Sequence, residues 1–205
     1  MKVTHLFIKK QTNSEMNLVK SLTVTDLQIV GQKISQPLRS VLITTKSLLD
    51  YWKIKPGVFR ENVVVDDVDI SKLQSGDEIQ IGEVVIRITF NCEPCGKVAF
   101  IANTEKLKRK RGVLGDFIND GSIHTGDEVK VLQKAKYEQI PEEYFKRIAW
   151  YLKEKVTGEI MAKDLLWNCG VAPGLIRALP RILIKHNIQG GPRVKYKKDI
   201  IEVTS

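Results

Sequence analysis

The sequence predicts a mainly β protein: a β-barrel with short helices, followed by a small helical domain that resembles a winged helix-turn-helix. In the first two-thirds, short runs rich in Val, Ile and Phe alternate with turn residues, which is typical of strands. After about residue 136, apolar residues recur at helical spacing. The chain has 205 residues, 42% hydrophobic and 28% charged, which suits a globular protein of one large or two small domains. We therefore expect domains at 1–135 and 136–205.

Seven short segments carry the strand pattern, and so many strands favour a closed barrel without exposed edges. "SGDEIQIGEVVIRI" predicts a hairpin with Gly82 and Glu83 at its tip. "LQSGDEIQI" and "IHTGDEVKV" both place Gly-Asp-Glu before a strand, where Gly can adopt positive φ and Asp can bond nearby backbone. The expected strands are 3–8, 39–44, 61–65, 78–82, 84–90, 97–101 and 128–132, with helical segments at 45–52 and 104–118.

The last third has a different pattern. Residues 142–156 have one apolar helical face, a second helix is expected at 159–167, and "NCGVAPG" is expected to form a turn. A third helix follows over 173–186, and Pro180 should kink it. With β-like segments at 192–196 and 200–204, this order predicts a winged helix-turn-helix.

Composition excludes several classes of protein. No run of about 18 apolar residues occurs, so we expect no membrane span. "MKVTHLFIKKQ" has a short apolar centre and no small-residue cleavage site, so it is expected to form a strand rather than a signal peptide. Three cysteines do not make a disulfide framework, and we expect reduced thiols in the cytoplasm.

The chain is basic, with a net charge of +9. Residues 1–135 contribute +4 and residues 136–205 contribute +5, so charge is denser in the C-terminal third. A basic surface favours phosphates and nucleic acid as partners, although it also simply keeps a protein soluble.

The stretch "FNCEPCGKVAF" holds two of the three cysteines and leaves four interpretations open. Cys92 and Cys95 are close enough in sequence for a redox pair, but the following residues predict a strand instead of the usual helix. A zinc site needs about four ligands, and Cys169 and the three His are scattered. Both thiols could be small buried side chains. Alternatively, Cys95 is a single functional thiolate that accepts sulfur or binds a soft metal such as molybdenum.

The surrounding residues resemble the MOSC family, the domain at the C-terminus of molybdenum cofactor sulfurases. The likeness covers residues 3–133 and is strongest in "RENVVVDDVDISKLQSGDEIQIGEVVIRITFNCEPCGKVAF" and "RGVLGDFINDGSIHTGDEVKVL". It rests on a Glu-Asn before a strand, a Pro-Cys after a strand, an Arg-Gly-Val, and a Gly-Asp-x-Val strand at the end. The resemblance implies a MOSC-type β-barrel.

The resemblance also implies a site. The family's key Cys, which is thought to carry sulfur or to hold the molybdenum of a pterin cofactor, maps onto Cys95. Arginine forks would bind the cofactor's phosphate, and Asn would bind a ring edge. With molybdenum bound, the implied chemistry is reduction of N-hydroxylated compounds; without it, the partner would be a sulfur donor, and we do not expect pyridoxal phosphate. The expected cofactor-binding residues are Arg39, Arg60, Asn62, Lys97 and Arg111.

The sequence departs from the family at two places. Many relatives carry a Gly-x-x-Gly-Asp-x-His run, whereas "DLQIVGQKISQP" has neither the Asp nor the His. If those residues hold the cofactor or substrate, this chain binds it differently, or its barrel has become a scaffold. Cys92 is an addition to the family pattern, and it could resolve a persulfide or sulfenic acid on Cys95.

Residues 136–205 resemble the DNA-binding domain of the O6-alkylguanine alkyltransferase-like family, through "IRALPRILIKHN". In that family an Arg fills the space of a flipped base, and it maps onto Arg177. The alkyl-acceptor Pro-Cys-His-Arg is absent, so alkyl transfer by that mechanism is excluded, and Cys169 is expected to be structural. The alternative hypothesis is therefore a DNA-binding module with a non-catalytic barrel. Its expected phosphate contacts are Arg177, Arg181, Lys185, Arg193, Lys195, Lys197 and Lys198.

Overall fold

The computed structural model describes residues 2–11, 15–33, 35–66 and 70–196, without the side chains of Ser71, Lys97 and Thr104. The chain forms two compact units, which we call the β unit and the helical unit. The β unit comprises residues 1–35 and 39–139, and the helical unit comprises 36–38 and 140–205. Among the described residues, none of the helices has the length and apolar character needed to cross a membrane.

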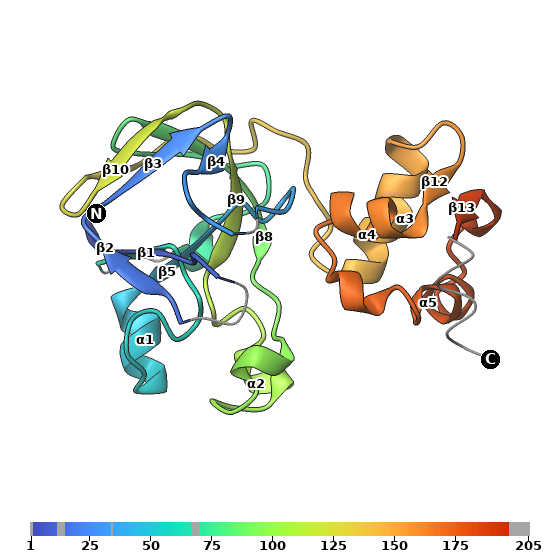
Figure 1. The fold of residues 1–205 in the computed structure, drawn as a ribbon, viewed down its shortest axis with the longest axis horizontal. Helices are drawn as coiled ribbons and strands as arrows, with labels where there is room; N and C mark the ends of the chain where they lie inside the picture. Colours follow the sequence, from blue (N-terminus) through green and yellow to red (C-terminus); the bar gives the residue numbers. More distant parts are fainter. Residues whose placement is uncertain (1, 12–14, 34, 67–69, 197–205) are drawn as a thin grey trace. The chain divides into compact units, whose positions relative to one another are not determined.

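The β unit is built on an eight-stranded sheet in the order β11-β7-β8-β9-β5-β6-β1-β2. Figure 1 labels β1, β2, β5, β8 and β9 of this sheet. The pairing of β5 with β6 is parallel, and the other pairings within this sheet are antiparallel. The strands are β1 (Val3–Ile8), β2 (Asn17–Val19), β5 (Val41–Thr45), β6 (Val63–Val65), β7 (Glu78–Ile81), β8 (Val84–Asn91), β9 (Val113–Phe117) and β11 (Val129–Gln133). A second sheet, in the order β10-β3-β4, contains β3 (Ser21–Thr25), β4 (Gln28–Ile29) and β10 (Gly121–His124).

The mainly β prediction is confirmed, but the closed barrel is wrong. The large sheet curls into a half-barrel, and within the described residues the segment before β11 meets the start of β1 at an isolated bridge between Lys2 and Glu128 and at backbone bonds of Val3 with Gly126 and Asp127. The contact stays short because β1 pairs with β2 from Leu6 to Ile8, and β2 is the edge strand there. The concave side holds a core of Val, Ile and Leu side chains that includes Leu6, Ile79 and Ile86.

The turn chemistry agrees with the prediction. Ile81 pairs with Val84 across the expected hairpin tip. In the two Gly-Asp-Glu phrases, Gly76 has φ 92° and Gly126 has φ 97°. Each following Asp accepts a backbone bond from three residues upstream: Asp77 from Gln74 N–H at 2.9 Å and Asp127 from His124 N–H at 2.7 Å.

Two of the predicted elements near the cysteines are wrong. The expected strand 97–101 is instead the 3-10 turn η2 (Gly96–Val98), followed by a non-strand turn. The expected helix 104–118 is only α2 (Thr104–Leu107), because Arg109 adopts φ 57° and Gly112 φ 112°, neither of which continues a helix. The residues after Gly112 form β9 between β5 and β8. The expected helix 45–52 is present as α1 (Lys46–Trp52), capped by Thr45.

Gly112 is required by the sheet, and this gives a testable prediction. An added Cβ would lie 2.1 Å from the carbonyl oxygen of Ile43, in addition to the cost of a positive φ. We expect Gly112→Ala to lower the free energy of unfolding by about 2–6 kcal/mol, the sum of backbone strain and overpacking. Gly126→Ala is the matched control, because Gly126 also has positive φ but open space around its Cβ position. If urea unfolding showed that both variants lose the same free energy of unfolding, this account of Gly112 would be contradicted.

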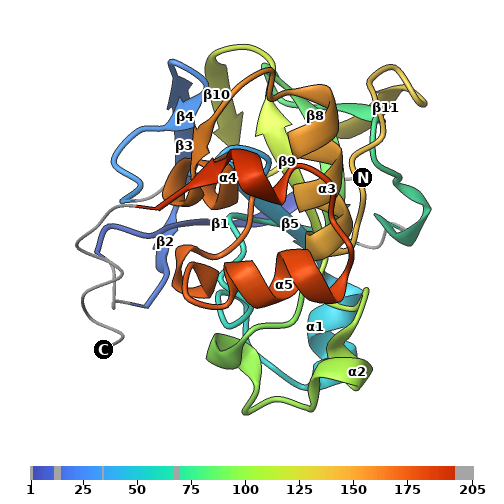
Figure 2. The same cartoon turned by 90° about the vertical axis from the view of Figure 1, so that its right-hand side faces the viewer.

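The helical unit contains α3 (Tyr144–Glu154), α4 (Ala162–Asn168) and α5 (Leu179–Lys185), shown in Figure 2. A short parallel pair, β12 (Ile160–Met161) and β13 (Val194–Lys195), accompanies the helices, with 3-10 turns η3 (Pro173–Leu175) and η4 (Gly191–Arg193). Its core includes Ile148, Leu165 and Leu179. The side-chain amide of Gln36 is 3.0 Å from the Val171 carbonyl, which explains why residues 36–38 belong to this unit.

A winged helix-turn-helix is not confirmed. The expected helix 173–186 begins only at Leu179, and Pro180 lies in its first turn, where it needs no kink. β13 pairs in parallel with β12 rather than with a second wing strand, and the expected strand 200–204 lies outside the described residues.

Candidate functional site

The segment between β8 and η2 presents one of the three thiols to solvent. Cys92 is buried at the end of β8, where its N–H donates to the Gly112 carbonyl at 2.9 Å. Cys95 is exposed and is the residue at which η2 begins. Cys169 is buried in the helical unit, as expected for a structural residue. Cys95 is therefore the accessible thiol of this chain.

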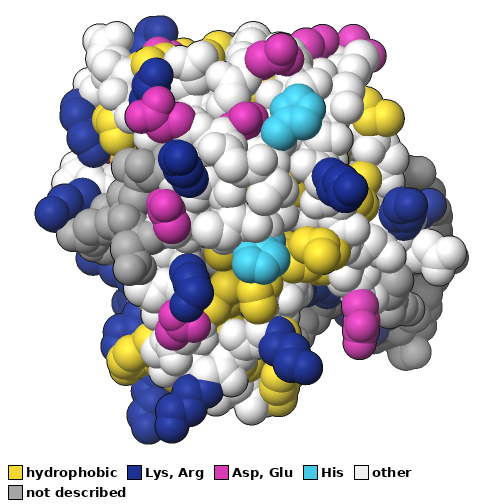
Figure 3. All heavy atoms as spheres, turned by 90° about the vertical axis from the view of Figure 1, so that its left-hand side faces the viewer, with side chains coloured by type: hydrophobic (Ala, Val, Ile, Leu, Met, Phe, Trp, Pro, Cys, Tyr) yellow, Lys and Arg dark blue, Asp and Glu magenta, His cyan; other side chains and the backbone are white. Residues whose placement is uncertain are grey.

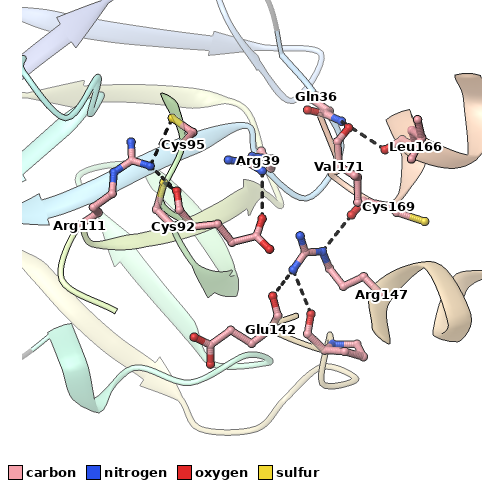
Figure 4. Close-up of polar contacts among 12 residues, drawn as sticks. Gln36, Arg39, Cys92, Cys95, Arg111, Glu142, Arg147, Leu166, Cys169 and Val171 are labelled. Carbon is pink, nitrogen blue, oxygen red and sulfur yellow. Dashed lines mark hydrogen bonds and ion pairs between the residues drawn. The ribbon is translucent and has the colours of Figure 1, made fainter. Parts of the chain in front are cut away.

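Arg111 lies beside Cys95 (Figure 4). It follows α2 and is only 3% exposed, although it carries a charge. Its Nη1 is 3.8 Å from the Cys95 Sγ and also donates to the Glu93 carbonyl, and its Nη2 donates to the Phe59 carbonyl at 2.9 Å. These main-chain bonds hold the guanidinium in place, so a positive charge faces the thiol.

Arg39, which precedes β5, contacts the segment between β8 and η2 that carries Cys95. Its Nη1 is 3.5 Å from a carboxylate oxygen of Glu93, and its guanidinium lies over the Phe90 ring at 5.9 Å from the ring centre. Both charged side chains are about three-quarters buried. Arg39 and Arg111 thus both contact Glu93, which lies in the loop that carries Cys95.

Glu61 is a residue that the sequence interpretation did not place in the site. Its side chain is buried; Oε1 accepts the Gly57 N–H at 2.6 Å, and Oε2 has no hydrogen-bond partner among the described residues. Burial raises the pKa of this carboxyl, despite the opposing hydrogen bonds and the nearby charge of Arg111. The sequence signal for Glu61 was the Glu-Asn pair, because a charged Glu directly before a buried strand is unusual.

The other predicted cofactor residues have different surroundings. Asn62 is 5% exposed. Its Oδ1 accepts from the Leu42 N–H, and its Nδ2 donates to the Phe7 carbonyl and to the Gln32 side chain, so it joins β5, β6 and β1. Arg60 is partly buried and has φ 68°, a conformation that Gly adopts without strain. The side chain of Lys97 lies outside the described residues.

The open interpretations of "CEPC" can now be compared with the geometry. No group of three or more His, Cys, Asp or Glu in the described part of the chain could hold a metal ion by itself, so a zinc clamp finds no support there. Cys92 fits a small buried side chain, and burial raises the pKa of its thiol. Cys95 does not fit that description, because it is exposed.

Thiol reactivity should follow this difference. We expect iodoacetamide to alkylate Cys95 in the folded protein at least about tenfold faster than Cys92 or Cys169, because only accessible thiolates react. Burial raises the pKa of Cys169 to about 12, which adds to its protection. Peptide mass spectrometry over a time course measures the three rates. Faster labelling of Cys92 than of Cys95 would show that the loop is arranged differently in solution.

The residues expected to contact nucleic acid in the helical unit do not form one free basic surface. Arg177, Arg181 and Lys185 are exposed. Arg193, however, donates to the carbonyls of Leu152 and Val156, both at 2.7 Å, so its charge is used inside the unit. Lys195 is 2.9 Å from Glu159. Lys197 and Lys198 lie outside the described residues.

Comparison with known proteins identifies the β unit. Residues 34–130 match the family model of the MOSC domain. The chain contains a MOSC domain. The match falls within residues 3–133, where the sequence resemblance was found. No curated protein matches the chain.

Solved structures share the fold of this MOSC protein. YuaD from Bacillus subtilis is 16% identical with a TM-score of 0.54, over 64% of this chain and 96% of that chain. YiiM from Geobacillus stearothermophilus is 15% identical with a TM-score of 0.54, over 64% and 75%. YiiM from Escherichia coli is 16% identical with a TM-score of 0.54, over 96% and 100%, so that alignment includes residues of the helical unit. These identities establish the fold alone. The alkyltransferase-like resemblance is not supported by these comparisons.

Proposed function

We propose that this MOSC protein is a sulfur carrier or molybdenum-cofactor-binding protein in which Cys95 is the reactive thiol. One observation carries the proposal: the exposed thiol of the chain lies 3.8 Å from the buried guanidinium of Arg111. The thiolate is the form of cysteine that attacks sulfur and ligates soft metals, and here the sulfur is accessible with a fixed guanidinium as its neighbour.

The residues around Cys95 fit a pterin-bound molybdenum. A Cys95 thiolate would be a soft ligand, and Arg39, which contacts Glu93 of the same loop, would supply a charged fork for the phosphate. Arg60 stays a prediction from the sequence. Arg111 Nε and Glu61 Oε2 are buried without hydrogen-bond partners among the described residues, so this region retains unused polar atoms. We leave Asn62 out of the proposed set, because its amide serves the sheet. When bound, the molybdenum centre would supply reduction of an N-hydroxylated substrate.

Sulfur transfer needs only residues of this chain and a persulfide donor. The Cys95 thiolate attacks the outer sulfur of the donor's persulfide, a new S–S bond forms at Cys95, and the donor's S–S bond breaks. The electron pair of the broken bond leaves with the donor as its thiolate. The Arg111 guanidinium, with Nη1 3.8 Å from the Cys95 Sγ, is placed to contact the attacking sulfur.

Elemental analysis and intact mass spectrometry test the proposal together. The protein is purified from cells that make molybdenum cofactor and from cells that cannot make it. We expect near-stoichiometric molybdenum in the first sample, or the mass of one added sulfur atom in both samples after exposure to a persulfide donor. Protein that carries neither molybdenum nor sulfur under these conditions contradicts the proposal.

A further inference from the structure

One end of the β unit carries an exposed basic and aromatic surface that the thiol site does not use. Helices α1 and α2 both lie at this end (Figures 1 and 2). A small hydrophobic cluster under them joins Leu49 of α1, Val98 of η2 and Leu107 of α2. We call this surface the basic end. It consists of Tyr51, Lys53, Lys55, Phe100, Lys106, Lys108, Arg109 and Lys110.

Direct contacts hold the two halves of the basic end together. The Trp52 indole N–H donates to the Lys110 carbonyl at 3.1 Å. The Lys110 ammonium lies 5.1 Å from the centre of the Tyr51 ring and 3.5 Å from its hydroxyl oxygen. The segment after α2 is therefore fixed against the end of α1, and its charges and rings form one surface.

The basic end concentrates the charge of the chain. Residues 46–55 hold three Lys and one Asp, a net +2, and residues 104–111 hold five Lys or Arg and one Glu, a net +4. Together they supply +6 of the net +9, although Arg111 within them is buried. Dark blue Lys and Arg side chains gather at the lower edge of the face in Figure 3. A cluster of this density attracts a polyanion.

Two exposed aromatic rings distinguish this surface from a merely solubilising one. Tyr51 is 62% exposed and Phe100 is 76% exposed. Cationic side chains that follow a phosphate backbone, together with aromatic rings on which bases stack, are the combination that binds single-stranded nucleic acid. Paired bases cannot stack on such rings, so a single strand fits better than a duplex.

We propose that the basic end binds single-stranded nucleic acid. The lysines and Arg109 contact phosphates, and Tyr51 and Phe100 stack against unpaired bases. Phe100 lies five residues after Cys95, so one residue of the proposed binding surface follows the thiol loop closely in the sequence. This inference does not depend on sulfur or molybdenum at Cys95. It also places nucleic-acid binding in the β unit instead of the helical unit.

Fluorescence anisotropy with a labelled, mixed-sequence single-stranded oligonucleotide of about 20 nucleotides, as DNA and as RNA, tests the proposal. Lys106→Glu/Lys108→Glu should weaken binding at least about tenfold and reduce the dependence of log affinity on log salt by about 0.7 for each phosphate that the variant no longer neutralises. Tyr51→Ala should weaken binding about five- to hundredfold at unchanged salt dependence. These side chains are exposed, and thermal unfolding verifies that the variants remain folded.

Arg177→Glu/Arg181→Glu is the matched control, since it makes the same change of net charge on the helical unit. It should weaken binding less than about threefold. The proposal fails if the native protein does not bind the oligonucleotide at low salt, or if this control weakens binding as much as Lys106→Glu/Lys108→Glu does. Binding of mixed phosphatidylcholine and phosphatidylserine vesicles as tightly as the oligonucleotide, abolished by the same variants, would also overturn it, because the basic end would then bind polyanions in general.

Discussion

Replacing Cys95 by serine is expected to abolish loading with molybdenum or sulfur, because a serine hydroxyl is neither a soft ligand nor a nucleophile toward a persulfide. The free energy of unfolding should stay within about 0.5 kcal/mol of the native value, since Cys95 is exposed. Elemental analysis and intact mass measure loading, and urea unfolding measures stability. The two readouts separate a chemical role from a structural one.

Cys169→Ala is the control for this experiment. It removes a buried thiol of the helical unit, so it should cost stability but leave loading unchanged while the protein is folded. Full loading of Cys95→Ser would exclude Cys95 as the reactive thiol. Loss of loading in folded Cys169→Ala would mean that the wrong cysteine has been assigned.

Replacing Arg147 by methionine is expected to lower the free energy of unfolding of the helical unit by about 3 kcal/mol or more. Arg147 is fully buried, and its guanidinium donates to the carbonyls of Pro141, Glu142 and Cys169. Methionine fills much of the space but donates nothing, and a buried carbonyl left without a donor, such as that of Cys169, costs about 1–3 kcal/mol, to which the part-buried carbonyls of Pro141 and Glu142 add. Far-ultraviolet circular dichroism in urea, where the loss of helix is followed, measures the effect.

Arg177→Met provides the comparison, because it makes the same substitution at an exposed position. It should change the free energy of unfolding by less than about 0.5 kcal/mol. If Arg147→Met unfolds at the same urea concentration as Arg177→Met, the buried guanidinium does not stabilise this unit.

The β unit was largely predictable because its strands alternate and its turns use glycine. β1 occupies the expected 3–8, and the Gly82 hairpin and both Gly-Asp-Glu turns are present. The misassigned segments are those in which tertiary contacts override local pattern. Residues 113–117 belong to β9 because β5 and β8 both pair with them, although they were expected within a helical segment at 104–118.

The site was predictable in part. The Pro-Cys pair indicated Cys95, and the Arg-Gly pair indicated Arg111, but their contact depends on folding that no local pattern encodes. Asn62 was expected to face a cofactor, whereas β5 and β1 use its amide. Arg193 was expected to contact phosphate, but it donates to the carbonyl of Leu152 in the last turn of α3 and to that of Val156 just after the helix. In both cases a polar side chain forms hydrogen bonds with backbone groups that become buried only when the elements pack together.

The most direct test of the central claim is to locate the bound group on a single cysteine. Protein loaded in cells or with a persulfide donor is treated with iodoacetamide beside unloaded protein, and the three cysteine peptides are analysed by mass spectrometry. We predict that Cys95 carries the added sulfur, or is protected from alkylation when molybdenum is bound, while Cys92 and Cys169 are unchanged. Equal alkylation of Cys95 in loaded and unloaded protein, with the sulfur or the protection at another residue, would contradict the assignment of Cys95 as the reactive thiol.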